Sequence, residues 1–290
     1  LVIIYAGGYL AGHAQQGRFF SFLFLFMGAM LGLVSADNLY ALFVLWELTS
    51  ITSFLLIGFD NKREASRRAA LQALVVTGGG GLILMAGIIV LNIITGANDL
   101  SGVLASGDVL RESPIYWLAF ILVLGGCFTK SAQFPFHFWL PGAMAAPTPV
   151  SAFLHSATMV KLGIYLLARL HPAFDELAVW AAPLVLVGRI TSVLAMLPTI
   201  RERDLKRILA WSTVSALGML VMLIGLPGPG AATATAAFLL AHALYKAPLF
   251  FVAGNIDLAT GTRNIDDLRG LGRTMPFTAA AGWMAGLSMA

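Results

Sequence analysis

The stretch "FILVLGGCFTKSAQFPFHFW" (residues 120–139) places a single lysine, Lys130, in the middle of an otherwise apolar run. A run of about 20 residues is the length that an α-helix needs to cross roughly 30 Å of hydrocarbon. The whole chain has the same character: 59% of its 290 residues are hydrophobic, 11% are charged, and the mean hydropathy is +0.85. Soluble domains are about 45–50% apolar and about 25% charged. The composition therefore predicts an integral membrane protein.

Similar apolar runs recur along the chain and predict eight complete spans: residues 19–35, 39–59, 69–95, 115–139, 149–169, 179–199, 208–226 and 232–256. A ninth run begins near Pro276 and is unfinished at Ala290. The run from Leu1 lacks the charged region and cleavage site of a signal peptide, so we expect it to be the end of a helix that starts upstream. In lipid every backbone polar group needs an internal partner. We therefore predict one all-α, polytopic transmembrane bundle over residues 1–290, incomplete at both ends.

Lysine and arginine residues are distributed unevenly among the predicted loops. One set of alternate loops holds only Arg111 and Arg169, and the other holds Arg18, Lys62, Arg63, Arg67, Arg68, Arg201, Arg203, Lys206, Arg207, Arg263, Arg269 and Arg273. The positive-inside rule places the basic loops in the cytoplasm. Because these residues lie in separate short loops with acidic neighbours and no aromatic platform, nucleic-acid binding is not expected.

Five charged residues remain inside predicted spans, each close to the middle: Glu47, Lys130, Lys161, Arg189 and Lys246. Each such charge costs about 3 kcal/mol or more to insert, so we expect them to face one another or water rather than lipid. A single buried lysine could be a structural ion pair or a snorkelling side chain. One acid cannot neutralise four cations, however, and lysine can release a proton where arginine cannot. The set predicts a proton relay.

Prolines follow Lys130 closely and predict that its helix is interrupted. Pro135 lies five residues beyond Lys130 inside the span, where it removes a backbone hydrogen bond and frees a carbonyl. Such irregular backbone is tolerated at membrane depth where protein or a water cavity satisfies it. The residues assigned to this break are Pro135, Pro141, Pro147 and Pro149.

Two histidines lie in polar surroundings within spans. His155 has Ser151 and Thr158 on its helix face, and His242 is one turn from Lys246. An intramembrane histidine is commonly a hydrogen-bonded core residue, but one beside a buried lysine is a stronger relay candidate.

No metal or phosphate site is expected. The chain has one cysteine and no H-x-x-x-H or H-E-x-x-H spacing, so a metal centre is not predicted. The glycines at 78–81 follow no strand and precede no lysine, and are interpreted as small residues for close helix packing.

Four segments together resemble the proton-translocating antiporter module that respiratory complex I shares with the Mrp-type multisubunit cation/proton antiporters. They are "WELTSITSFLLIGF" (46–59), "KSAQFPFHFWLPGAMAAPTPVSAFLHSATMVKLGIYLLARL" (130–170), "DLKRILAWSTVSALG" (204–218) and "HALYKAPLFFVAGNID" (242–257). The segments at 19–38 and 63–81 and the lysine of "HSATMVK" resemble the large A subunit of the Mrp complex more closely.

The resemblance implies a role for each of these groups except Arg189, which has no place in it and is expected to be structural. Glu47 would pair with Lys130, His155 and Lys161 would continue a mid-membrane path, and His242 and Lys246 would extend it. It also implies an Mrp-type subunit of a bacterial cell membrane that exchanges Na⁺ or a similar cation for H⁺, without an organic cofactor and together with other membrane subunits. The alternatives are a proton-pumping subunit of a complex I-like or hydrogenase complex, or a scaffold that does not transport. The module has fourteen helices, so this chain would contain only part of it.

Overall fold

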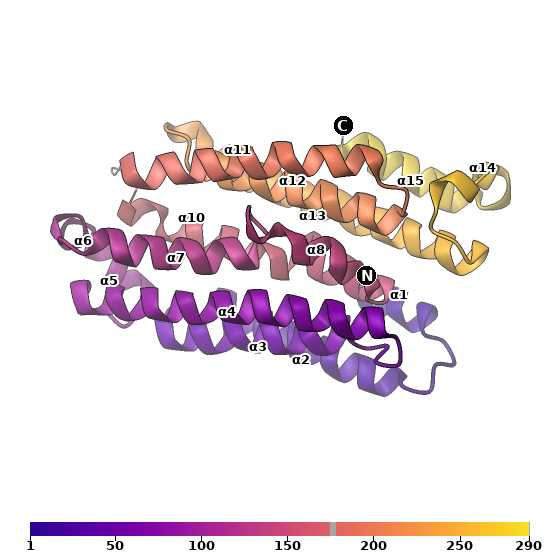
Figure 1. Ribbon diagram of the computed structural model, residues 1–290, viewed down its shortest axis with the longest axis horizontal. Coiled ribbons are helices and arrows are strands. Elements are labelled where there is room, and N and C mark those ends of the chain that lie inside the picture. The colour runs from indigo at the N-terminus through magenta and orange to yellow at the C-terminus, as the bar shows by residue number, and fades with distance from the viewer. Residues whose placement is uncertain (175–177, 290) are drawn as a thin grey trace.

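A computed structural model describes residues 1–174 and 178–289, which form a bundle of helices (Figure 1). In chain order the α-helices are α1 (Val2–Tyr9), α2 (Gln16–Ser35), α3 (Leu39–Ile57), α4 (Glu64–Thr95), α5 (Leu100–Ala105), α6 (Gly107–Glu112), α7 (Tyr116–Lys130), α8 (Trp139–Gly142), α9 (Thr148–Ala152), α10 (Leu162–Phe174), α11 (Ala178–Arg201), α12 (Leu205–Ile224), α13 (Pro229–Thr260), α14 (Leu271–Thr274) and α15 (Pro276–Met289). This confirms the predicted fold class.

The predicted spans match the long helices. Within the described ranges, seven helical segments are long and apolar enough to cross a membrane, and α7 is a shorter apolar helix at the position of the remaining predicted span. The short helix α1 and the helix α15 lie where partial spans were predicted. The protein is therefore a multi-pass membrane protein.

The helices form three layers, visible in Figure 1. Helices α2, α3 and α4 make one layer, and α4 packs on α7 of the middle layer, which also holds α8 and α10. Helices α11, α12 and α13 form the third layer, and α15 packs on α13. The segment α9 lies between the middle layer and α13 and contacts α1 as well. Irregular backbone in the middle layer is thereby enclosed by helices.

Polar side chains fix where the long helices begin. Asn38 accepts hydrogen bonds from the backbone N–H groups of Tyr40 and Ala41 at the start of α3, and Asp204 accepts one from Arg207 N at the start of α12. These caps satisfy N–H groups that have no partner inside the helix. Two isolated β-bridges, Asn38 with Asp99 and Asp204 with Asn264, join the capped starts to other loops. The caps and bridges hold the ends of neighbouring helices in register.

The helix that carries Lys130 is interrupted, as the sequence predicted. Helix α7 ends at Lys130, and the chain continues through a turn, the 3₁₀ segment η1 (Phe136–Phe138) and α8. Pro135 stands immediately before η1, after a cis peptide bond. Pro141 lies within the single turn of α8, where a missing N–H costs no intrahelical bond. Pro147 and Pro149 stand at the start of α9.

Candidate ion pathway

Lys130 is fully buried at the carboxyl end of α7 and reaches across to α3. Its Nζ donates hydrogen bonds to the Trp46 carbonyl oxygen (3.1 Å) and to Ser50 Oγ (2.7 Å). The ammonium lies 5.3 Å from the centroid of the Trp46 ring. The carboxyl end of a helix also favours a cation. Neutral oxygens, a π-face and the helix dipole therefore hold this lysine in the bundle.

Glu47 follows Trp46 on α3, but its carboxylate is turned towards α4. Its Oε1 is buried without a hydrogen-bond partner. A Cβ added at Gly81 would overlap Oε1, and one at Gly78 would lie 3.6 Å from Oε2. Among the described residues no direct ion pair joins Glu47 to Lys130, although the two charges act on one another electrostatically. The direct pairing implied by the resemblance is therefore not seen among these contacts, because Lys130 is hydrogen-bonded to Trp46 and Ser50 instead.

The glycine run of α4 makes room for both neighbouring helices. Gly81 faces Glu47 of α3, whereas a Cβ at Gly80 would overlap the Thr129 side chain of α7. Gly79 points away from both, with nothing within 4 Å of its would-be Cβ. The interpretation as packing residues is confirmed for Gly80 and Gly81 and does not hold for Gly79. One of them packs directly against the carboxylate of the candidate pathway.

Lys161 follows an irregular stretch between α9 and α10. The π-helical turn η3 (Phe153–Ala157) leads into the 3₁₀ turn η4 (Met159–Lys161). The Lys161 Nζ donates to the carbonyl oxygen of Ser156 and to that of Leu239 on α13 (3.4 Å). A π-turn leaves backbone carbonyls without their usual helical partners and is frequent at functional sites. Lys161 is buried at 5% exposure, and its contacts link the middle layer to α13.

Lys246 and His242 lie one turn apart on α13, as predicted, and both are buried. The Lys246 Nζ donates to Ser212 Oγ of α12 (2.7 Å) and lies 5.6 Å from the centroid of the Tyr245 ring. His242 packs edge-on against Tyr245, and neither of its ring nitrogens has a hydrogen-bond partner among the described residues. It lies within the electrostatic reach of both Lys161 and Lys246.

His155 is fully buried in the π-turn, with its ring 6.2 Å from that of Trp139. Within residues 1–174 and 178–289, neither of its ring nitrogens has a hydrogen-bond partner, and the same holds for Thr148 Oγ1 and Ser151 Oγ. These three side chains are spaced three and four residues apart, so they share one face of the segment. Buried polar groups without protein partners are sites that internal water satisfies.

One buried cation was missed by sequence reasoning, which assigned Lys206 to a cytoplasmic loop. Lys206 lies in the first turn of α12 at 1% exposure, and its Nζ donates to the Ala146 carbonyl oxygen (2.6 Å) just before α9. Its charge acts on His155. Its place among charged residues in "RERDLKR" hid this burial, because the segment that covers it is distant in the sequence. The Asp204 cap was the one signal that α12 starts before Lys206.

Arg189 differs from the other four intramembrane charges. Its side chain is exposed on α11, whereas the prediction was that all five would face one another or water within the bundle. The close approach of Gly188 to the α12 backbone fixes the rotation of α11 and turns Arg189 outward.

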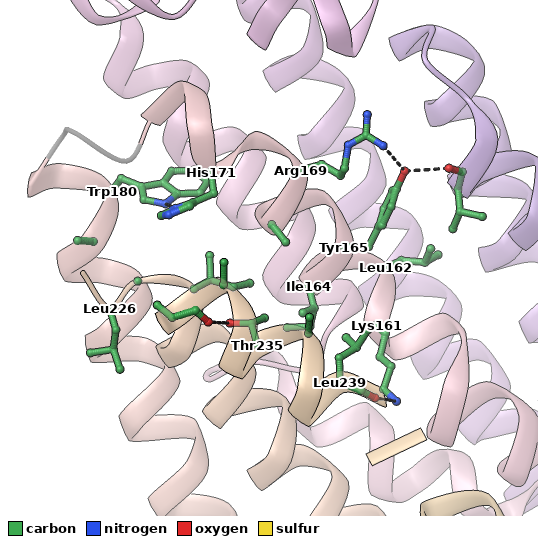
Figure 2. A pocket seen from close by; sticks show the side chains of 18 of the residues that line it. Lys161, Leu162, Ile164, Tyr165, Arg169, His171, Trp180, Leu226, Thr235 and Leu239 are labelled. Atoms are coloured by element: carbon green, nitrogen blue, oxygen red, sulfur yellow. Dashed lines mark hydrogen bonds between the residues drawn. The ribbon is translucent and has the colours of Figure 1, made fainter. Parts of the chain in front are cut away.

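A cavity of about 870 Å³ extends from Lys161 along α10. Figure 2 shows Lys161 at one end, with His171 and Trp180 at the other. Tyr165 lies beside Arg169 in the same view, donating to the Val34 carbonyl oxygen (3.0 Å) and accepting from Arg169 Nη1 (3.4 Å). The walls are mostly apolar, and the wall opposite α10 is the start of α13. The buried Lys161 therefore lines one end of this cavity.

Together, the fold and these groups define a class: a polytopic membrane protein with several ionisable side chains buried between its helices. The family described as "NADH:quinone oxidoreductase/Mrp antiporter, TM" matches residues 36–290. The chain belongs to this family.

Individual relatives agree with the family match. The chain is 49% identical over 290 residues to a probable K⁺/H⁺ antiporter A/B subunit of Rhizobium meliloti (strain 1021), covering 100% of this chain and 29% of that protein. It is 45% identical over 303 aligned positions to the Na⁺/H⁺ antiporter A1 subunit of Staphylococcus aureus (strain JH9), covering 100% of this chain and 38% of that protein. The chain thus spans well under half the length of these relatives.

A solved structure shares the fold. The Mrp complex from Dietzia sp. DQ12-45-1b contains a chain that superposes with a TM-score of 0.91 at 39% identity. The match covers 99% of this chain and 33% of that chain.

Proposed function

We propose that this chain is the ion-translocating part of one subunit in a multisubunit cation/proton antiporter. One observation carries the proposal: Lys130, Lys161 and Lys246 are all buried, and among the described residues each donates hydrogen bonds to carbonyl or hydroxyl oxygens and forms no ion pair with a carboxylate. A buried ammonium without a counter-ion is costly, and such intramembrane groups mark ion pathways. Glu47, His155 and His242 complete the proposed path.

The proposed path crosses the bundle laterally, from α3 and α7 through the π-turn to α13. Lys130 lies between the Ser50 hydroxyl and the charge of Glu47. If Lys130 or Glu47 gains or loses a proton, the attraction between Lys130 and Glu47 changes relative to the hydrogen bond between Lys130 and Ser50. A serine hydroxyl both donates and accepts, so Ser50 and Ser212 can keep a hydrogen bond to either the protonated or the neutral lysine.

In the proposed path, the Leu239 carbonyl connects Lys161 of the middle layer to α13. This carbonyl accepts from Lys161 one helical turn before His242 on α13. Because Lys161 and Lys246 both act on His242, a proton gained or lost by one lysine changes the field at the next. We propose that this coupling passes protonation changes along the row.

Access from each side is part of the proposal. The Thr148, Ser151 and His155 face would carry water from the Lys206 end of α12, which we place on the cytoplasmic side with the basic loops. The cavity that begins at Lys161 would open the path towards the other side.

The remaining parts of the function rest on the relatives. We propose that the chain works in a bacterial cell membrane with other membrane subunits, and that H⁺ is exchanged for Na⁺ or K⁺, the cations named for the two relatives. No organic cofactor is required. A proton-pumping subunit of a redox complex is the second candidate, favoured by the family description alone.

The test is cation-driven proton exchange by the complete complex in everted vesicles, read as collapse of ΔpH after Na⁺ or K⁺ is added. Replacing Lys161 by alanine should abolish exchange, and replacing it by arginine should also fail, because a guanidinium stays protonated. Lys62→Ala, a change to an exposed loop lysine, is the matched control. Normal exchange in the Lys161 variants at equal protein levels would refute the path. A wild-type complex that responds only to an electron donor would support the redox candidate instead.

A further inference from the structure

Helix α11 lies at the edge of the bundle and packs principally against α12 (Figure 1). The packing is close, because a Cβ added at Gly188 would lie 2.6 Å from the Gly218 carbonyl oxygen. Thr191 on the same side of α11 is also buried, at 2% exposure. These contacts fix the rotation of α11, and the opposite side of the helix faces away from the described part of the chain.

Arg189 lies at the centre of that outward side. Its side chain is exposed, and no hydrogen bond, ion pair or ring contact joins it to another described residue. Leu186 and Val193, one turn before and one turn after it, are each 60% exposed, and Leu197 is 57% exposed. The outward side is therefore an apolar stripe with one positive charge in the middle.

Contact with lipid is energetically unfavourable for an arginine at this position. It stands about eleven residues from either end of α11, or roughly 16 Å at 1.5 Å per residue, which is about half the hydrocarbon thickness. Long basic side chains reach the interface when they lie near helix ends, not at the centre. A guanidinium does not lose its charge, and an exposed one at this depth costs at least about 3 kcal/mol.

We propose that the outward side of α11, centred on Arg189, is an interface with a neighbouring subunit, and that its partner is a membrane helix with an aspartate or glutamate at the same depth. A carboxylate matches the guanidinium fork with two parallel hydrogen bonds. The apolar stripe above and below supplies the packing surface for a helix and offers no polar group to hold a lipid headgroup. The named relatives are parts of larger assemblies, which supplies a source for such a helix.

The first test locates the partner while Arg189 is intact. A photo-crosslinking amino acid is placed at Leu186 or Val193 in the complete complex, and the products are identified by mass spectrometry. The proposal expects a crosslink to a membrane segment of another subunit that contains an acidic residue. Crosslinks only to lipid, or only to another part of this same polypeptide, would overturn it.

The second test asks whether assembly of the complex depends on the positive charge of Arg189. Arg189→Glu should lower the fraction of the chain recovered in the complex on native gels by at least tenfold. Losses should be smaller for Arg189→Leu and smallest for Arg189→Lys, because an ammonium keeps the charge but cannot form the two parallel hydrogen bonds. Arginine at the acidic position found by crosslinking should restore assembly of Arg189→Glu. Failure of that exchange to restore assembly, or wild-type assembly of Arg189→Glu alone, would refute the proposal. Neither result depends on transport.

Discussion

Replacing Gly81 by alanine tests whether the position of the Glu47 carboxylate matters for exchange. The new Cβ would overlap Glu47 Oε1 and lie 2.7 Å from Glu47 Cδ. Carbon atoms pack at about 3.5–4.0 Å, so the carboxyl carbon must move by about 1 Å and the oxygen further. The Trp46 Cδ1 atom lies 3.3 Å from the same Cβ, so the new methyl group is crowded on that side as well.

The expected effect follows from two magnitudes. Overpacking of this kind costs about 1–3 kcal/mol of stability, which a bundle of this size should survive. A displacement of about 1 Å of a reacting group can cost about a hundredfold in rate. We therefore expect Gly81→Ala to lower cation-driven exchange between tenfold and a hundredfold, while the complex still assembles.

Gly79→Ala is the matched control, because nothing lies within 4 Å of the Cβ at that position. It makes the same chemical change two residues away and should leave exchange unaltered. A second variant separates position from bulk: Glu47→Asp shortens the acid by one methylene and leaves space for the new methyl group. The double variant Gly81→Ala/Glu47→Asp should exchange faster than Gly81→Ala alone. Equal rates for Gly81→Ala and Gly79→Ala, at equal protein levels, would refute the reasoning.

Two further substitutions test the contacts of the buried lysines. Ser50→Ala removes a hydroxyl that binds the Lys130 ammonium, and because hydrogen bonds to charged groups contribute about 1.5–3 kcal/mol, exchange should fall by about tenfold or more. Ser53→Ala, which loses only a bond within α3, should not change the rate, and equal losses would argue against a specific role for the Ser50 contact. Lys206→Ala frees a buried carbonyl before α9 and should lower the melting temperature of the purified complex, unlike Lys62→Ala; equal melting temperatures would show that this contact is dispensable.

Much of the fold could be predicted from the sequence because the bilayer imposes simple requirements. Span length and composition located the long helices, and Pro135 located the interruption after Lys130. Lys130, Lys161 and Lys246 were found by the same reasoning, since a charge at mid-span stands out in a hydropathy pattern. The spacing of His242 and Lys246 also gave their shared face correctly, because both lie on one regular helix.

Three features were decided only by the tertiary structure. Lys206 is buried because the backbone before α9 returns to cover the start of α12, a contact between residues 60 positions apart. Arg189 faces outward because Gly188 fixes the rotation of α11, and hydropathy carries no information about which side of a helix meets a neighbour.

The third feature is the carboxylate of Glu47. The sequence determined that an acid and a lysine lie at one depth, but the packing of α3 on α4 turned Glu47 to Gly81 while Lys130 bound the adjacent Trp46 and Ser50. Successive residues on a helix point about 100° apart, so a small rotation decides which neighbour a side chain meets. Hydrophobicity sets the depth of a residue in the membrane, and close packing between helices sets the direction in which its side chain points.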